Sequence, residues 1–270
     1  MQPKSIVVKK DSRGVLTLTL NRPEVRNAFN DTVVLELTQI FTEIQNDSTL
    51  RAVVLRGEGP VFCAGGDLNW MKKAVEFAPA ENLHDARSVA HLFQLMDDCP
   101  KPLLALVQGA AIGGGVGLVS VCDVAFATED AKFGLSEVRL GVVPACIGPF
   151  VVAKIGASQA RRFFITGERF SAKKAEEIGL VHGVYPGVNE AEAALSQVLE
   201  SVLESGPQAV SVAKKLIADL CSRDELGTQE EVLENVAQLL ARVRAGREAQ
   251  EGFRAFLEKR KPRWTLEEKK

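Results

Sequence analysis

The amino-acid sequence predicts an α/β fold with a helical C-terminal region. Near the N-terminus a strand pattern, a helix pattern and a second strand pattern follow one another, which is the order typical of an α/β domain. Beyond residue 188, apolar residues recur at helical spacing instead. The chain of 270 residues exceeds the usual size of one domain, so we expect one large domain and an appendage.

The first elements can be placed by their periodicity. Residues 14–20 alternate apolar and polar side chains, which predicts a half-buried strand. Asn30 is suited to cap the helix that follows. This helix would bury four apolar residues on one face: Val34, Leu37, Phe41 and Ile44. Residues 52–55 (AVVL) then predict a second, buried strand.

Two glycine-rich loops each follow a predicted strand. Residues 57–68 follow the strand at 52–55, and residues 109–117, with five glycines, follow a buried strand at 104–107 and lead into a helix start. A main chain without Cβ atoms admits a ligand, and the first turn of a helix leaves N–H groups without partners. The two loops could therefore each donate one N–H to the same carbonyl oxygen, as it becomes negative during a reaction.

Glu137 is a candidate acid/base, because it is the one carboxylate in residues 133–138 and comes about twenty residues after the second loop. The residues also allow other interpretations. Glycine clusters often mark tight turns or close packing, and an isolated glutamate is often a solvated surface residue. The glycine spacing fits neither G-x-G-x-x-G nor a phosphate-binding loop, so a nucleotide site of either kind is not expected.

Composition excludes several classes of protein. Hydrophobic residues make up 46% and charged residues 25%, as in globular domains, and the net charge of −2 makes a nucleic-acid partner unlikely. The three histidines, His84, His91 and His182, have no metal-ligand spacing, so no metal site is expected. No apolar run could serve as a signal peptide or span a bilayer. We expect no membrane partner, and a cytoplasmic enzyme or a processed organellar one.

The cysteines are expected to be reduced and structural. There are five, scattered without a C-x-x-C pair: Cys63, Cys99, Cys122, Cys146 and Cys221. Cys63 lies in the first glycine-rich loop and could be considered a nucleophile. No histidine is near it in the sequence, however, so a small packed side chain is the favoured interpretation.

The C-terminal part is predicted to be helical. Ser158 and Ser171 are suited to begin two helices, and Gly179 to end the second. Three further helices are predicted at residues 188–204, 207–220 and 231–244. The last carries an apolar stripe: Val232, Val236, Leu239, Leu240 and Val243.

Four ordered segments resemble the successive signatures of the enoyl-CoA hydratase/isomerase (crotonase) superfamily. They are residues 21–29, 62–68, 109–117 and 133–144, and the resemblance extends from about Val15 to the chain end. It implies a spiral core of ββα turns in residues 1–200 and a helical trimerisation region in residues 201–270. It also implies a homo-oligomer, either a trimer or a dimer of trimers. The substrate would be an acyl-CoA thioester, with coenzyme A as part of the substrate and no separate cofactor.

The resemblance also implies site residues. The backbone N–H groups of Gly66 and Gly114 would form the oxyanion hole, and Glu137 would be the catalytic side chain. Matching positions for substrate binding are Val25, Arg26, Ala28, Ala64, Gly65, Asp67, Leu68, Phe256 and Lys259. Of these, residues 25–28 would lie near the adenine. Phe256 and Lys259 would reach the nucleotide bound by a neighbouring subunit.

Gly117 departs from the well-known hydratases, which carry a second glutamate at the matching position to help hold a water. Single-glutamate relatives include isomerases and hydratases of branched or aromatic acyl-CoA. The local sequence, including residues 145–147, is most similar to bacterial 3-methylglutaconyl-CoA hydratase-like proteins of leucine catabolism and their isoprenoid-chain counterparts. We therefore expect hydration of a branched 2-enoyl-CoA. A Δ3,Δ2-enoyl-CoA isomerase and a weakly catalytic CoA-binding or RNA-associated protein are the alternatives.

A methylglutaconyl substrate carries a second carboxylate, which should be met by a cation or several donors. The candidate cations are Lys72, Lys73, Arg87 and Arg139. Each of them could equally be a solvated surface charge.

Overall fold

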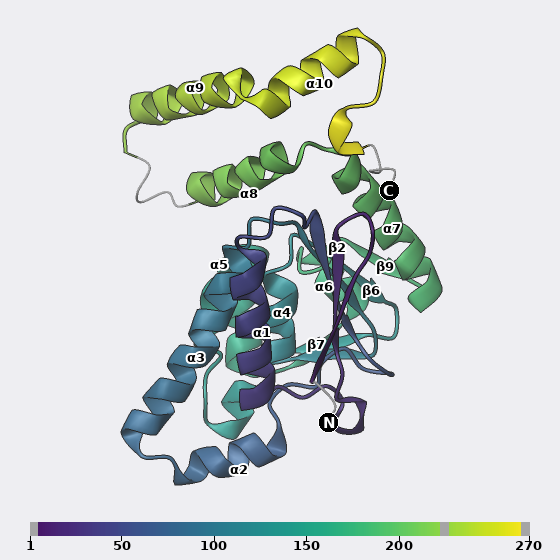
Figure 1. The fold of residues 1–270 in the computed structure, drawn as a ribbon. Coiled ribbons are helices and arrows are strands. Elements are labelled where there is room, and N and C mark those ends of the chain that lie inside the picture. The colour runs from purple at the N-terminus through teal and green to yellow at the C-terminus, as the bar shows by residue number, and fades with distance from the viewer. Residues whose placement is uncertain (1–4, 222–226, 266–270) are drawn as a thin grey trace.

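The computed structural model describes residues 5–221 and 227–265. It confirms an α/β fold with a helical C-terminal region. In Figure 1 a sheet with helices against it forms the body of the molecule, and α8 (Pro207–Cys221), α9 (Gln229–Ala245) and α10 (Arg247–Leu257) lie together at one end.

The main sheet has six strands in the order β1-β2-β3-β4-β6-β9. They are β1 (Ile6–Lys10), β2 (Val15–Leu20), β3 (Ala52–Gly57), β4 (Leu103–Val107), β6 (Val124–Thr128) and β9 (Gly183–Tyr185). β1 is antiparallel to β2, and all the other pairs are parallel. Because parallel strands end at the same edge of a sheet, the loops after β3 and β4 lie side by side.

A smaller sheet lies beside the first and has the order β5-β7-β8. Its strands are β5 (Ala110–Ile112), β7 (Lys132–Gly134) and β8 (Arg169–Ser171). β5 belongs to the second glycine-rich loop, and β7 leads into the turn that carries Glu137. The small sheet therefore ties the glycine-rich loop to the candidate acid/base.

The remaining helices of the described residues are α1 (Asp31–Ile44), α2 (Leu68–Glu76), α3 (Pro79–Asp97), α4 (Gly114–Ser120), α5 (Gly148–Thr166), α6 (Ala172–Glu177) and α7 (Val188–Glu204). None of the helices in the described parts of the chain is both long and apolar enough to cross a membrane.

Both faces of the main sheet are buried, and successive residues of a strand point into two different cores. In β4, Leu103, Ala105 and Val107 join the larger core with α1, α3, α4 and α5. Leu104 and Leu106 join a smaller core with α7 on the other face. This double burial explains why β4 is a continuous apolar run.

The first predicted elements are confirmed. β2 alternates as expected, and the Asn30 side chain accepts a hydrogen bond of 2.9 Å from the Val33 N–H at the start of α1. All four predicted core residues of α1 are buried, together with Val33. Ser171 likewise caps α6 by accepting from the Lys174 N–H at 3.2 Å, and Gly179 follows that helix with a φ of 80°.

A helical segment does restart close to the predicted Ser158, but Ser158 does not cap it. α5 already begins at Gly148, with Pro149 in its first turn, where a missing N–H does no harm. Helical dihedral angles are interrupted at Gly156, with φ 73° and ψ 156°, and resume before Ser158. The helix is thus restarted by a glycine with positive φ, and no capping bond from a serine side chain is involved.

The C-terminal helices follow the prediction closely, since α7, α8 and α9 differ from it by at most two residues at either end. The expected boundary between residues 200 and 201 falls within α7, which packs on the main sheet. Arg51 joins this region to the sheet by donating to the carbonyl oxygens of Leu203 (2.9 Å), Ser205 (2.8 Å) and Trp264 (2.9 Å).

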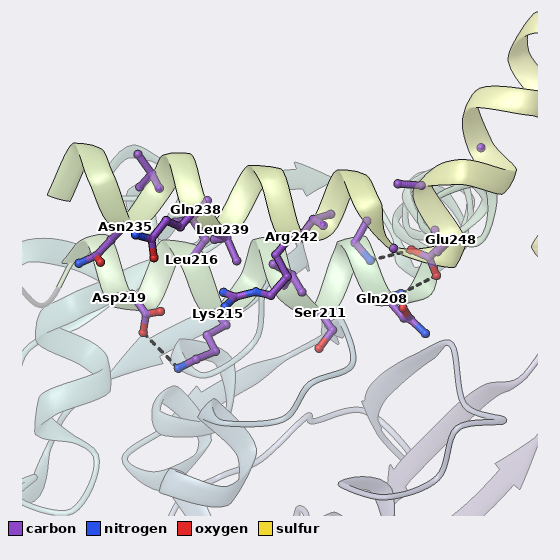
Figure 2. Close-up of a pocket in the computed structure, with 18 of the residues that line it drawn as sticks. Gln208, Ser211, Lys215, Leu216, Asp219, Asn235, Gln238, Leu239, Arg242 and Glu248 are labelled. Atoms are coloured by element: carbon purple, nitrogen blue, oxygen red, sulfur yellow. Dashed lines mark hydrogen bonds and ion pairs between the residues drawn. The ribbon is translucent and has the colours of Figure 1, made fainter. Parts of the chain in front are cut away.

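The helices α8, α9 and α10 enclose a groove of about 1010 Å³. Figure 2 shows side chains of α8 and α9 facing one another across it, among them Leu216 and Leu239. Four residues of the apolar stripe predicted for α9 line the groove and Leu240 does not, and none of the five is fully buried within one chain. Leu240 is 55% exposed and Phe253 of α10 is 50% exposed.

Candidate active site

The first segment of the candidate site, residues 21–29, is fixed by Asn27. This residue is 2% exposed and has a φ of 55°, a conformation that asparagine tolerates better than most residues. Its side-chain amide donates to the carbonyl oxygens of Glu58 (2.9 Å) and Val61 (2.7 Å), and its oxygen accepts from the Arg22 N–H (2.9 Å). Residues 21–29 are thereby attached to the first glycine-rich loop.

Asp67 holds the same loop to α2. Its carboxylate accepts from the N–H groups of Asn69 (2.7 Å) and Trp70 (3.3 Å) and forms a 2.8 Å ion pair with Arg22. Burial alone would raise the pKa of Asp67, but the bonds from Arg22 and the two amides outweigh it and lower the pKa. Asp67 was matched to substrate binding, and the structure gives its carboxylate these partners within the protein.

The backbone of Gly66 lies opposite Phe29. The Phe29 N–H donates to the Gly65 carbonyl (2.7 Å), and the Asp67 N–H donates to the Phe29 carbonyl (2.8 Å). The Gly66 N–H takes no part in this pair of bonds and, as in any extended strand, points to the other side. A Cβ at Gly66 would lie 2.7 Å from the Met71 Cε, so this side chain covers the glycine.

The two glycine-rich loops are in direct contact. The Cys63 N–H donates to the Ala110 carbonyl (3.0 Å), and the Ile112 N–H donates to the Cys63 carbonyl (3.0 Å). A Cβ at Gly115 would lie 2.8 Å from the Cys63 carbonyl oxygen, so only glycine permits this approach. Burial raises the pKa of Cys63 to about 11, which makes it a neutral packed thiol and a poor nucleophile.

Gly114 is the first residue of α4, and its N–H belongs to the helical turn that has no internal acceptors. Gly113 before it has φ 52° and ψ −116°, a conformation reserved for glycine. A Cβ at Gly114 would lie 3.7 Å from the Phe29 ring. Phe29 therefore contacts both loops, through its main chain at Gly66 and its ring at Gly114.

Glu137 begins the short 3-10 turn Glu137–Leu140 after β7. Its Oε1 lies 3.0 Å from where a Cβ of Gly113 would be, which places the carboxylate beside the N-terminus of α4. Its Oε2 is buried and has no hydrogen-bond partner among the described residues. Burial raises the pKa of Glu137 above its ordinary value. A carboxylate that is half-buried and partly unpartnered is suited to exchange protons with a bound molecule.

Position 117 is closed to any side chain. A Cβ at Gly117 would overlap the Ile147 Cγ2 and would lie 2.9 Å from the Phe93 Cε1. Ile147 is 4% exposed and Phe93 is fully buried. Hydrocarbon thus fills the place that a second glutamate would need. The resemblance included residues 145–147, but nothing in the sequence predicted this contact.

The predicted substrate-binding residues fall into two groups. Residues 25–28 lie beside the first glycine-rich loop, since the Ala64 N–H donates to the Arg26 carbonyl at 3.0 Å. Leu68, at the start of α2, is 74% exposed. Phe256 and Lys259 lie at the end of α10, at the opposite end of the molecule from α2 in Figure 1. Within one chain they do not join the other site residues.

The four candidate cations for a distal carboxylate all lie at the surface. Lys72 and Arg87 are exposed on α2 and α3. Lys73 pairs with Asp31 at 3.4 Å, and the Arg139 side chain lies against Gly167, with its Nε 3.2 Å from the position of a Cβ there. Of the four, Lys72 and Arg87 are therefore the two side chains for which no such interaction with the rest of the protein is described.

The chain resembles known proteins over nearly its whole length. The family model described as enoyl-CoA hydratase/isomerase matches residues 10–267. The chain is 34% identical to 2,3-dehydroadipyl-CoA hydratase of Escherichia coli strain K12, over 95% of this chain and 97% of that protein. It is also 34% identical to a mitochondrial Δ(3,5)-Δ(2,4)-dienoyl-CoA isomerase of Dictyostelium discoideum, over 94% and 88%. The crystal structure of an enoyl-CoA hydratase from Shewanella pealeana superimposes with a TM-score of 0.91 at 36% identity, covering 97% of each chain.

The chain therefore belongs to the enoyl-CoA hydratase/isomerase family and has the crotonase fold. It is an enzyme of the hydratase type, and isomerisation is the other reaction named among its relatives. An acyl-CoA thioester fits this family as the class of substrate.

Proposed function

We propose that the protein hydrates a branched 2-enoyl-CoA thioester to a 3-hydroxyacyl-CoA, with Glu137 as general base and general acid. The observation that carries this proposal is the buried, unpartnered Oε2 of Glu137 beside the N-terminus of α4. The N–H groups of Gly66 and Gly114 would bind the thioester oxygen. Each well-placed donor of this kind is typically worth about 3 kcal/mol in the transition state.

In this mechanism Glu137 accepts a proton from a water molecule as the water oxygen bonds to C3 of the substrate. The electrons of the double bond move to C2 and the thioester carbonyl, whose negative oxygen the two N–H groups stabilise. Protonated Glu137 then returns a proton to C2, so the elements of water are added and the carboxylate is restored. Coenzyme A arrives and leaves as part of the substrate, and we propose no separate cofactor.

The candidate substrate is 3-methylglutaconyl-CoA, an intermediate of leucine catabolism. The local sequence supports it, and so does a relative whose name specifies 2,3-dehydroadipyl-CoA, a thioester that also ends in a carboxylate. Lys72 and Arg87 are exposed and form no ion pair among the described residues, and either could meet the distal carboxylate. Hydration of this substrate would add water beside its branching methyl group.

The second candidate is a Δ3,Δ2-enoyl-CoA isomerase. Moving a double bond needs one base and an oxyanion hole but no bound water. The side chains packed against Gly117 favour isomerisation, because they leave no room at that position for a second carboxylate beside Glu137. A relative named as a dienoyl-CoA isomerase supports it as well. A weakly catalytic CoA-binding protein is the third candidate.

One experiment separates the three. The purified protein is incubated with a panel of 2-enoyl and 3-enoyl thioesters, including 3-methylglutaconyl-CoA, and the products are analysed by mass spectrometry. Hydration adds the mass of one water, whereas isomerisation leaves the mass unchanged and consumes the 3-enoyl thioesters. Tight CoA binding without turnover of any thioester would contradict both enzymatic proposals.

We also propose that the protein is a homo-oligomer, a trimer or a dimer of trimers. The support is the groove between α8, α9 and α10, whose apolar side chains are incompletely buried in one chain. Phe256, which is 81% exposed, could then reach a neighbouring site.

All five cysteines are free thiols, which agrees with a reducing compartment such as the cytoplasm.

A further inference from the structure

Ile147 and Phe93 form an apolar wall against Gly117. Gly117 is buried in the core, and a single methyl group added there would meet both side chains. The two residues come from different parts of the chain, since Phe93 lies on α3 and Ile147 immediately precedes α5. Both side chains are buried in the close-packed core, so they have little room to move away from Gly117.

The wall is continuous with the oxyanion loops. The Phe93 ring stacks on the Phe29 ring, with centroids 6.0 Å apart and planes within 14°. Phe29 in turn contacts Gly66 through its main chain and Gly114 through its ring. A change in the wall should therefore move the residues that are proposed to bind the thioester oxygen.

The wall also lies close to the acid/base. Glu137 contacts the Cβ position of Gly113, and Ile147 occupies that of Gly117. The Gly117 N–H donates to the Gly113 carbonyl at 3.1 Å, so the two glycines are one turn apart at the start of α4. Glu137 and Ile147 thus contact two glycines that lie one turn apart at the start of α4.

We propose that Ile147, supported by Phe93, is a specificity-determining residue, and this rests on the hydratase function proposed above. The Ile147 side chain keeps a second polar group, and any water bound to that group, away from this side of the reacting carbons. Glu137 alone therefore accepts and donates the protons. The same apolar surface packs against the alkyl branch at C3. A straight-chain substrate leaves that surface without a partner, and the site therefore prefers a branched acyl group.

The contact itself is tested by a pair of substitutions. Gly117→Ala in the natural background should lower the melting temperature and the hydration rate, because the new methyl meets Ile147. In an Ile147→Gly background, Gly117→Ala should cost much less in both measurements. Gly148→Ala is the matched control, because its Cβ would have a nearest neighbour at an ordinary 3.6 Å. If Gly117→Ala were as harmless as Gly148→Ala, the wall would not exist as described.

The specificity is tested with Ile147→Ala and the milder Ile147→Val. The measured quantity is the ratio of kcat/KM for 3-methylcrotonyl-CoA to that for crotonyl-CoA, which differ by the branch methyl alone. Loss of contact with one methyl group should lower this ratio about ten-fold in Ile147→Ala and less in Ile147→Val. An unchanged ratio in both folded variants would overturn the proposal. Failure of the natural protein to hydrate any 2-enoyl thioester, 3-methylglutaconyl-CoA included, would instead overturn the proposed function.

Discussion

Glu137 has its pKa raised by burial, and its carboxylate forms no salt bridge with any residue that the structure describes. An ionisable group kept in such surroundings is a burden on stability, so its presence indicates a chemical purpose. The residue lies beside Gly113 only because β7 and β5 pair, which brings positions 137 and 113 together.

Glu137→Gln should remove most of the activity. The amide keeps the size of the side chain but can neither accept nor return a proton at the required stage. General acid–base catalysis typically contributes about 10²- to 10⁴-fold, so a loss of at least about 100-fold in kcat is expected. Binding of CoA, measured by calorimetry, should stay within a few fold. Full activity in this variant would exclude Glu137 from the mechanism.

The raised pKa of Glu137 also predicts a pH dependence. As a base Glu137 must be ionised, so kcat/KM should fall as the pH drops through its raised pKa, above the ordinary value of 4.5. This acidic limb should vanish from the residual activity of Glu137→Gln. A profile whose acidic limb lay at the value of an ordinary exposed glutamate would contradict the burial seen here.

The same shift makes a prediction for stability. Between the ordinary and the raised pKa the folded protein binds more protons than the unfolded chain, so Glu137 lowers the free energy of unfolding as pH rises through this window. Glu137→Gln should therefore be more stable than the natural protein at pH 7, and this advantage should shrink below pH 4.5. Urea unfolding at the two pH values measures it. An advantage that was larger in acid would have the wrong sign.

Local patterns in the sequence pointed to the two glycine-rich loops after strands and to Glu137 as a nearby carboxylate, whereas Gly66 and Gly114 were implied by the resemblance to the crotonase superfamily. The sequence assigned no positioning role to Arg22 or Asn27. Their role depends on contacts with residues 58, 61 and 67, which only folding brings near. Residues 21–29 contain other polar and charged side chains, so the sequence offered no local signal that set Arg22 and Asn27 apart.

At the level of elements, the Arg22–Asp67 pair predicts how firmly the first glycine-rich loop is held. Arg22→Met would leave the Asp67 carboxylate, 4% exposed, without its cation. Removing one partner of such a pair should cost about 3 kcal/mol in the free energy of unfolding. Activity should fall as well, because the loop carries the Gly66 N–H.

Lys73→Ala is the matched control for this prediction. It breaks the Lys73–Asp31 pair, whose side chains are 63% and 54% exposed. An exposed pair of this kind contributes less than about 1 kcal/mol. Urea unfolding of both variants provides the comparison. Equal losses in the two would show that the Arg22–Asp67 pair has no special importance.

Long elements with a clear repeat were predictable, and short ones were not. α7 begins and ends at the expected residues because its apolar residues repeat with the period of a helix. β5, β7 and β8 have three residues each, too few for alternation to appear. Yet these strands join the glycine-rich loop to Glu137, so the sequence alone could not show how the site is assembled.

At the scale of the whole molecule, the groove between α8, α9 and α10 predicts the state of assembly. Leu239→Asp would place a charge among apolar residues that we expect to be covered by another subunit. It should shift the protein toward monomers in sedimentation velocity experiments. Ala237→Asp is the control, since Ala237 is exposed on the same helix and does not line the groove. A natural protein that sediments as a monomer would contradict the proposed assembly.

The main sheet has its strands side by side in the order in which they occur along the chain. During synthesis the N-terminal part emerges first, so each new strand meets a partner that has already left the ribosome. α8, α9 and α10 are made last, after the body that holds Glu137. Under the assembly proposed above, half-made chains on neighbouring ribosomes would therefore lack the surface through which finished subunits associate.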